Sequence, residues 1–210
     1  MLVVILSWEY PPRIVGLLSD YVKKLSSELA KMGVKTYTVT YHDFITGEAK
    51  ENEVIVCRVT NPVKTHISVL TWALTLNQEI ARAAANIWYR ENGQVDVVDV
   101  QDWHFVPAAV TLKNALHIPF VYTVESLEDH RSYGANSPLN MAIKSVEQLG
   151  MNEAEKVIAK SVWMAQEIKR IYNVPMRKIK VVTPKNEAWI EAILEIYKSV
   201  IRKRISSGSR

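Results

Sequence analysis

Three short stretches of this sequence carry the residue types that commonly bind ligands. They lie at residues 9–16, 102–104 and 125–131, and each follows a run that predicts a buried strand. Together they supply carboxylates and histidines for hydrogen bonds to hydroxyl groups, arginines that can pair with phosphate, and a glycine that allows close approach to the backbone. If the strands are parallel neighbours, their carboxyl ends meet at one edge of a sheet, where ligands bind in such folds. The pattern therefore predicts one site built from all three stretches.

The first stretch joins a strand at residues 2–6 to a helix that begins at Gly16. A strand, a turn and a helix N-terminus together present backbone amides and a positive helix end to an anion. Arg13 could contact a phosphate there, or it could be a solvated loop arginine. The side chain of Leu17 hinders close approach, and the carboxylate of Asp20 competes with an anion for the helix end. We expect the architecture of an anion-binding turn without its ligand.

The elements that must position these stretches alternate between strand-like and helix-like segments. Apolar or β-branched runs predict the strands, and longer amphipathic segments predict the helices. This alternation predicts an α/β fold, namely a Rossmann-like parallel sheet with helices on both faces. Polar loops are predicted over residues 42–52 and 126–138. The predicted strands are 2–6, 34–41, 53–59, 95–101, 118–124, 156–159 and 179–182, and the predicted helices are 16–32, 66–92, 105–116, 139–155, 161–172 and 186–204.

Composition narrows the class of protein. The chain has 210 residues, of which 48% are apolar and 23% charged, with a net charge of +4. Its Lys and Arg residues are scattered apart from 202–204, so we expect no nucleic-acid partner. No apolar run approaches the roughly 20 residues of a membrane span, and the N-terminal run is too short for a signal peptide. The single cysteine, Cys57, fits a reducing compartment, and we expect a cytoplasmic protein that binds neither membrane nor metal.

Five motifs occur in a fixed order along the chain. Residues 7–16 read Ser-Trp-Glu-Tyr-Pro-Pro-Arg-Ile-Val-Gly, residues 96–104 read Asp-Val-Val-Asp-Val-Gln-Asp-Trp-His, and residues 118–124 read Ile-Pro-Phe-Val-Tyr-Thr-Val. Residues 152–161 read Asn-Glu-Ala-Glu-Lys-Val-Ile-Ala-Lys-Ser, and residues 174–182 read Val-Pro-Met-Arg-Lys-Ile-Lys-Val-Val. In this order the motifs resemble the N-terminal half of a glycogen-synthase-like glycosyltransferase, and the likeness extends from residue 1 to about residue 183.

The resemblance implies the GT-B fold, in which two Rossmann-like domains face a cleft. The N-terminal domain carries the acceptor side and the C-terminal domain binds the nucleotide-sugar donor. Residues 1–183 would form the acceptor-side domain, and no donor domain follows them. Instead, residues 186–204 resemble the family's last helix, which crosses back to cover the N-terminal domain and bury apolar surface there. We therefore expect a truncated glycosyltransferase without its donor-binding domain.

Asp102 and His104 match an Asp-Trp-His motif of this family. The resemblance implies that Asp102 accepts hydrogen bonds from hydroxyl groups of the acceptor sugar, and that His104 shapes the wall of the cleft. A second interpretation, which stays open, is that the Asp102 side chain caps the helix that follows and satisfies its free amides.

Two positions depart from the family pattern. Where relatives read Gly-Gly-Leu, this chain reads Gly16-Leu17, and where they read Thr-Val-His, it reads Thr-Val-Glu125. The family histidine contacts the transferred sugar, whereas an ionised carboxylate only accepts hydrogen bonds, so no catalytic residue is intact. We expect Glu125 to pair with Arg131 or Arg13. His130 could take the place of the histidine, or it could be a solvated loop residue.

Three hypotheses for function follow. The first is a hexosyltransferase N-terminal domain that cannot transfer sugar alone, because by resemblance the cations that stabilise the leaving diphosphate belong mostly to the donor domain. No cofactor is expected, and ADP-glucose or UDP-glucose would be the donor in a full-length relative. The second is a subunit of a split enzyme completed by a separate donor-domain protein. The third is a non-catalytic carbohydrate-binding or regulatory module for a glucan or sugar acceptor. Without a donor domain, the face of this domain that borders the cleft would be exposed. We therefore expect this face to associate with a partner, for example a second copy of the chain in a homodimer.

Overall fold

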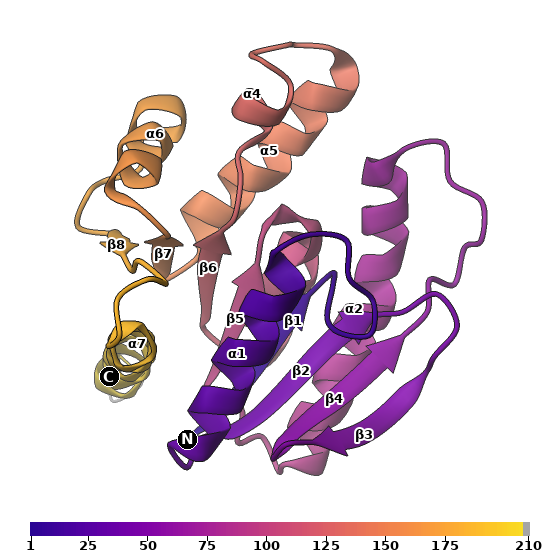
Figure 1. The fold of residues 1–210 in the computed structure, drawn as a ribbon, viewed down its shortest axis with the longest axis vertical. Helices are drawn as coiled ribbons and strands as arrows, with labels where there is room; N and C mark the ends of the chain where they lie inside the picture. Colours follow the sequence, from indigo (N-terminus) through magenta and orange to yellow (C-terminus); the bar gives the residue numbers. More distant parts are fainter. Residues whose placement is uncertain (208–210) are drawn as a thin grey trace.

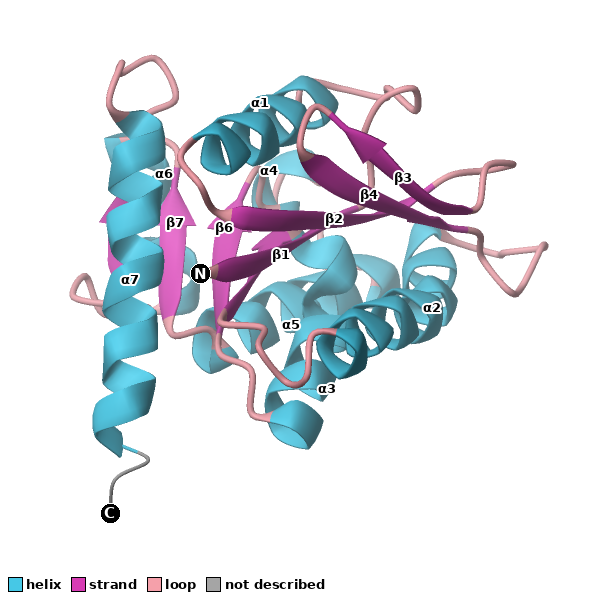
Figure 2. Cartoon of the chain, turned by 90° about the horizontal axis from the view of Figure 1, so that it is seen from below, coloured by secondary structure: helices cyan, strands magenta, loops and turns pink. Residues whose placement is uncertain are grey.

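The computed structural model describes residues 1–207 and contains one sheet with helices on both of its faces (Figures 1 and 2). The strands are β1 (Leu2–Ser7), β2 (Lys35–Tyr41), β3 (Gly47–Glu51), β4 (Val54–Val59), β5 (Val97–Gln101), β6 (Phe120–Val124), β7 (Lys156–Ala159) and β8 (Ile179–Val181). The α-helices are α1 (Leu18–Lys31), α2 (Val69–Arg90), α3 (Val106–Leu116), α4 (Glu128–Arg131), α5 (Pro138–Glu153), α6 (Val162–Tyr172) and α7 (Trp189–Ser207), and a 3-10 turn, η1 (Trp103–Phe105), precedes α3.

The order of the strands confirms the predicted α/β, Rossmann-like class. The sheet runs β3-β4-β2-β1-β5-β6-β7-β8, and each neighbouring pair is parallel except β3 with β4. From β1 the chain continues outward to β2, whereas from β5 it continues outward on the other side to β6. This reversal opens a crevice at the carboxyl ends of β1 and β5, the usual place for a ligand in such sheets. The stretches that follow β1, β5 and β6 meet there.

Apolar side chains fill both sides of the sheet, which explains why the central strands read as continuous apolar runs. On one face the strands pack against α2, α3, α5 and α6. On the other face they pack against α1 and α7. All six residues of β1 are buried, so this strand contributes alternately to the two halves of the core.

Two predicted loops contain regular structure. The segment 42–52 was expected to be a polar loop, but Gly47–Glu51 form β3, which pairs antiparallel with β4. An edge strand whose side chains face solvent needs no apolar alternation, which is why the polar sequence hid it. Within the second loop, Glu128–Arg131 form α4, one turn anchored by buried contacts of Glu128. The last helix begins at Trp189, three residues later than its predicted start.

Helix α7 covers the sheet beside α1 (Figure 2). The Trp189 ring packs against Tyr21 of α1 with ring centroids 5.0 Å apart, and the Tyr197 hydroxyl donates to the carboxylate of Asp99 on β5. Thr123 donates to the other Asp99 oxygen at 2.9 Å. Burial raises the pKa of Asp99 to about 6, although these two hydrogen bonds act to lower it. The contact therefore joins α7 to the middle of the sheet through a buried polar group.

Gly150 in α5 marks the closest approach of a helix to the sheet. A methyl group at this position would stand 2.8 Å from Cγ2 of Val106 and 2.9 Å from the Tyr122 ring. Both neighbours are fully buried and have little room to move. We expect Gly150→Ala to destabilise the domain by about 1–3 kcal/mol despite the better helix propensity of alanine, as measured by urea denaturation. The control is Ser145→Ala on the exposed side of α5. Gly134→Ala is unsuitable: an added Cβ would meet no atom within 4 Å, but the φ of +77° would itself strain an alanine.

Within residues 1–207, no helix has the length and apolar character needed to cross a membrane.

Candidate functional site

A pocket of about 470 Å³ opens where the loops after β1, β5 and β6 converge. Four of the five predicted site residues line it, namely Gly16, Asp102, His104 and Glu125. Arg13, the fifth, is not among the lining residues. The remaining lining residues include carboxylates, one guanidinium and several apolar side chains. They come from the β1–α1 loop, the starts of α1 and α2, η1 and the α4–α5 region: Trp8, Glu9, Leu17, Leu18, Val69, Trp103, Ser126, Glu128, Arg131, Leu139 and Ile143.

The backbone of Asp102 has a conformation that is normally reserved for glycine. Its φ is +63° and its ψ is 180°, so the residue carries strain that the surrounding contacts must hold. Its N–H donates to the Thr123 carbonyl of β6 at 2.9 Å, which fixes the turn where β5 ends. The side chain makes no capping hydrogen bond to η1, so the helix-cap interpretation of Asp102 is wrong. The turn instead directs the carboxylate to the pocket wall.

The Asp102 carboxylate is buried with part of its hydrogen-bonding capacity unused. The residue is 4% exposed; Oδ2 accepts from the Ser126 hydroxyl at 3.4 Å, while Oδ1 has no partner. Burial raises the Asp102 pKa to about 7, opposed chiefly by the charge of Arg131. Buried acceptors without partners are uncommon and call for a specific explanation. A ligand that donates a hydrogen bond would satisfy Oδ1.

His104 is held between two indole rings. Its ring stacks on Trp8 with centroids 4.7 Å apart and on Trp103 at 4.2 Å. Burial lowers the His104 pKa to about 3, so the imidazole is neutral at physiological pH. Its Nδ1 has no hydrogen-bond partner and lies 4.0 Å from Asp102 Oδ2. His104 is therefore an uncharged group whose Nδ1 can donate or accept one hydrogen bond, depending on the tautomer.

Asn77 on α2 supports this arrangement and was not predicted. Its amide donates to the His104 carbonyl at 2.8 Å, and its carbonyl oxygen accepts from the Ala108 N–H at 2.8 Å. It thereby satisfies backbone groups at the start of α3. An asparagine on the otherwise apolar face of α2 was the only signal for this role in the sequence.

Glu125 pairs with Lys160, not with Arg131 or Arg13 as expected. The register of β6 and β7 explains the difference, because Val124 pairs with Ala159 and the next residue of each strand therefore lies beside the other. The Lys160 ammonium also lies 3.4 Å from the ring centroid of Tyr21. Burial lowers the Lys160 pKa, against the opposing effect of Glu125. Glu125 thus neutralises a lysine at the pocket edge.

Arg13 and His130 do not line the pocket, although Arg13 also donates to the carbonyl of Trp8 at 3.3 Å. The Arg13 guanidinium lies 4.9 Å from the Tyr41 ring centroid and pairs with Asp43 at 3.2 Å, so it is neither a pocket residue nor a solvated arginine. His130 Nε2 lies 2.8 Å from a Glu167 carboxylate oxygen, and its ring stacks on Trp163. His130 does not line the pocket, so it does not take the place of the family histidine there.

Arg131 is fixed by two carboxylates. It donates to Glu128 Oε2 at 3.0 Å and to Glu147 Oε1 at 2.7 Å, and its third contact is with the Ser126 hydroxyl at 2.5 Å. Glu147 is fully buried on α5 and also accepts from the Glu128 N–H and the Tyr172 hydroxyl. This network holds the α4 side of the pocket in place.

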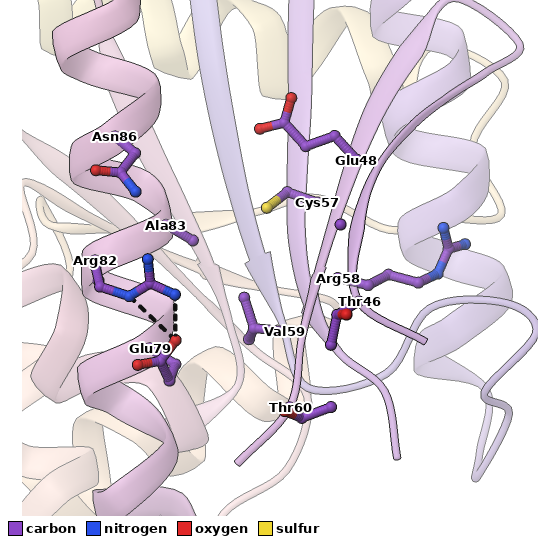
Figure 3. A pocket seen from close by; sticks show the side chains of 11 residues that line it. Thr46, Glu48, Cys57, Arg58, Val59, Thr60, Glu79, Arg82, Ala83 and Asn86 are labelled. Atoms are coloured by element: carbon purple, nitrogen blue, oxygen red, sulfur yellow. Dashed lines mark hydrogen bonds and ion pairs between the residues drawn. The ribbon is translucent and has the colours of Figure 1, made fainter. Parts of the chain in front are cut away.

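A second pocket lies between α2 and the β3–β4 pair (Figure 3). On α2, Arg82 pairs with Glu79, as the dashed lines in Figure 3 show, and Glu48 of β3 pairs with Arg90. Burial raises the pKa of Cys57 at its floor to about 11, so the thiol stays protonated. These groups satisfy one another, and we assign no chemistry to this pocket. Over residues 1–207, no three His, Cys, Asp or Glu side chains gather in a way that could hold a metal ion.

Comparison with known proteins identifies the family. Residues 18–184 match the model of Glycosyltransferase Family 4. The chain belongs to glycosyltransferase family 4. It is 33% identical over 184 residues to an uncharacterised glycosyltransferase of Methanocaldococcus jannaschii, a match that covers 87% of this chain and 45% of the relative. It is 24% identical over 196 residues to a glycogen synthase of Mycobacterium tuberculosis, with 87% of this chain and 47% of the relative covered. The chain therefore spans slightly less than half the length of these relatives.

Solved structures show the same GT-B N-terminal fold for this family 4 chain. Sucrose-phosphate synthase from Thermosynechococcus elongatus matches with a TM-score of 0.67 at 14% identity, over 87% of this chain and 47% of that one. A second structure of that synthase also has a TM-score of 0.67, at 13% identity, and the match covers 96% of this chain and 98% of that one. At these identities the likeness concerns the fold alone.

Proposed function

We propose that this family 4 chain is the acceptor-side half of a hexosyltransferase and binds a sugar hydroxyl group in the pocket between β1, β5 and β6. The observation that carries the proposal is that Asp102 lines the pocket while its buried Oδ1 has no hydrogen-bond donor. A sugar hydroxyl supplies that donor and can also accept or donate at the neutral His104. Aromatic and apolar walls with a few oriented polar groups are typical of small-ligand sites.

We further propose that the 210 residues cannot transfer sugar from ADP-glucose or UDP-glucose by themselves. Transfer requires cations or oriented dipoles that stabilise the leaving diphosphate. Among the described residues that line the pocket, Arg131 is the one cation, and Glu128 and Glu147 already bind it. Glu125, at the position of the family histidine, neutralises Lys160. The pocket thus lacks an unengaged cation for a diphosphate.

The role proposed for α7 is that of the family's crossover helix. Coverage of this chain is 87% in the first match to sucrose-phosphate synthase and 96% in the second. The larger share supports a counterpart for α7 in the second of these structures. The buried face of α7, including Trp189, Ile193 and Tyr197, gives the helix a structural reason to stay with this half.

Isothermal titration calorimetry with maltotriose tests the acceptor proposal. The wild-type chain is expected to bind, and Asp102→Ala to bind at least about tenfold more weakly because the acceptor oxygen is lost. Asp102→Gly, which suits the positive φ, serves as a second variant, and Asp20→Ala on the exposed first turn of α1 is the matched control. No binding of glucose oligomers by wild type would reject an acceptor site. Glucose transfer from ADP- or UDP-glucose by this chain alone would reject the claim of incompetence.

A second candidate is a split enzyme completed by a separate donor-domain protein. It is favoured by the exposed apolar side chains at the carboxyl edge of the sheet, where Leu17 is 84% exposed and Ile67 94% exposed. A homodimer could cover the same face, and a module that only binds carbohydrate would leave it free. Light scattering of this chain, alone and with a donor-domain protein, separates a dimer, a heteromeric complex and a monomer.

A further inference from the structure

The β1–α1 loop of the pocket already holds an anion that belongs to the chain itself. Glu9 Oε2 accepts hydrogen bonds from the Val15 N–H and the Gly16 N–H, both at 2.8 Å. These amides immediately precede α1, where backbone N–H groups and the helix dipole favour a negative group. Glu9 is 2% exposed, and a Cβ on Gly16 would stand 3.6 Å from its Oε1. The carboxylate therefore lies directly against the glycine and uses the donors that a phosphate would need.

The nearby cations are also engaged. Arg13 of the same loop pairs with Asp43 and lies over the Tyr41 ring. Arg131 lies between two carboxylates, and Lys160 pairs with Glu125. An anionic ligand would have to break one of these pairs and would meet the carboxylates that line the pocket. Like charges at short range oppose its binding.

The unused hydrogen-bonding groups in the pocket favour an uncharged ligand. Asp102 Oδ1 and His104 Nδ1 are buried without partners. A hydroxyl group can both donate and accept, so it can satisfy an acceptor oxygen beside a neutral imidazole. A phosphate group at neutral pH offers mainly acceptor oxygens, so it leaves Asp102 Oδ1 unsatisfied when that carboxyl is ionised.

We propose that Glu9 determines ligand specificity by occupying the anion site of the β1–α1 loop. Its carboxylate excludes phosphorylated and carboxylated ligands, and the pocket selects uncharged polyhydroxyl compounds. The preference for hydroxyl ligands rests on the proposed acceptor function. The exclusion of anions rests only on the contacts of Glu9, so the two can be tested separately.

NMR titration with inorganic phosphate tests the exclusion of anions. The backbone amide signals of Val15 and Gly16 are followed in wild type and in Glu9→Gln, which keeps an acceptor oxygen but removes the charge. We expect no saturable shift of either signal in wild type. In Glu9→Gln we expect saturable shifts and an affinity for phosphate at least about tenfold higher. Asp20→Asn makes the same change of charge on the exposed first turn of α1. It should gain clearly less affinity for phosphate than Glu9→Gln, because the amides of Val15 and Gly16 donate to Glu9.

Three outcomes would overturn the role of Glu9. They are saturable phosphate binding at these two amides in wild type, no gain in Glu9→Gln, and an equal gain in Asp20→Asn. A further experiment uses the wild-type chain alone and compares the binding of glucose and glucose 6-phosphate by calorimetry. If glucose 6-phosphate binds as tightly as glucose or more tightly, the proposal is also rejected. Absence of glucose and maltotriose binding, combined with phosphate binding gained only in Glu9→Gln, would reject the acceptor function while supporting the role of Glu9.

Discussion

Replacing Glu147 with alanine is expected to destabilise the domain by about 2–4 kcal/mol, because it leaves the buried Glu128 N–H and Tyr172 hydroxyl without their acceptor and removes one of the two carboxylates of Arg131. Glu147 is fully buried and binds Arg131 at 2.7 Å, the Glu128 N–H at 2.8 Å and the Tyr172 hydroxyl. Its removal therefore leaves three donors with fewer partners. Urea denaturation followed by tryptophan fluorescence measures the loss, and α4 should become the most readily exchanging helix in amide hydrogen exchange.

A comparison of variants separates the lost charge from the lost hydrogen bonds. Glu147→Gln keeps an acceptor oxygen and is expected to lose less stability than Glu147→Ala. The double variant Glu147→Leu with Arg131→Met removes both charges and should cost less than the sum of the two single changes, since neither charge is then left unpaired. Additive losses, or a loss below about 0.5 kcal/mol for Glu147→Ala, would contradict the stabilising role of this network.

Replacing Asp102 with asparagine is expected to stabilise the chain at pH 8 by about 1–3 kcal/mol and to weaken the binding of sugar that we propose for this pocket. Burial raises the Asp102 pKa to about 7, well above its value in an unfolded chain. The folded protein therefore binds more protons than the unfolded protein between about pH 4 and pH 7. The contribution of Asp102 to the free energy of unfolding accordingly falls as pH rises through that window. Asparagine does not titrate, so the Asp102→Asn variant does not lose this stability.

Thermal unfolding of both proteins across pH 4–8 measures this difference. The two curves should lie close together near pH 4, where Asp102 is largely protonated in the folded state and its charge is not yet penalised, and diverge as pH approaches 8. Asp99 is also buried with a pKa raised to about 6, but it is common to both proteins and cancels in the difference. A constant offset over the whole range, or a variant that is less stable at pH 8, would show that the Asp102 charge is not penalised in the folded state. Such a stability gain with loss of binding is expected where a site retains strain for function.

The sequence alone determined the α/β class and most of the location of the candidate site. Apolar runs such as 2–6 and the alternation with helices predict a parallel sheet, and the carboxyl ends of parallel strands share an edge. For that reason the strand pattern groups Gly16, Asp102, His104 and Glu125 at one edge, and all four line one pocket. The edge strand β3 escaped prediction because exposed polar side chains carry no periodic signal.

Only the tertiary structure decided which side chains meet within that edge. Glu125 and Lys160 are 35 residues apart and are brought together by the register of two strands, which no local pattern encodes. Arg13 pairs with Asp43 over the Tyr41 ring, and the Glu9 carboxylate accepts hydrogen bonds from the amides of Val15 and Gly16. Strand patterns follow from the burial of apolar side chains, which is periodic and can be predicted from sequence. Pairing of polar side chains depends on register, rotamer and desolvation at a few ångströms, and these are set only when the whole core has packed.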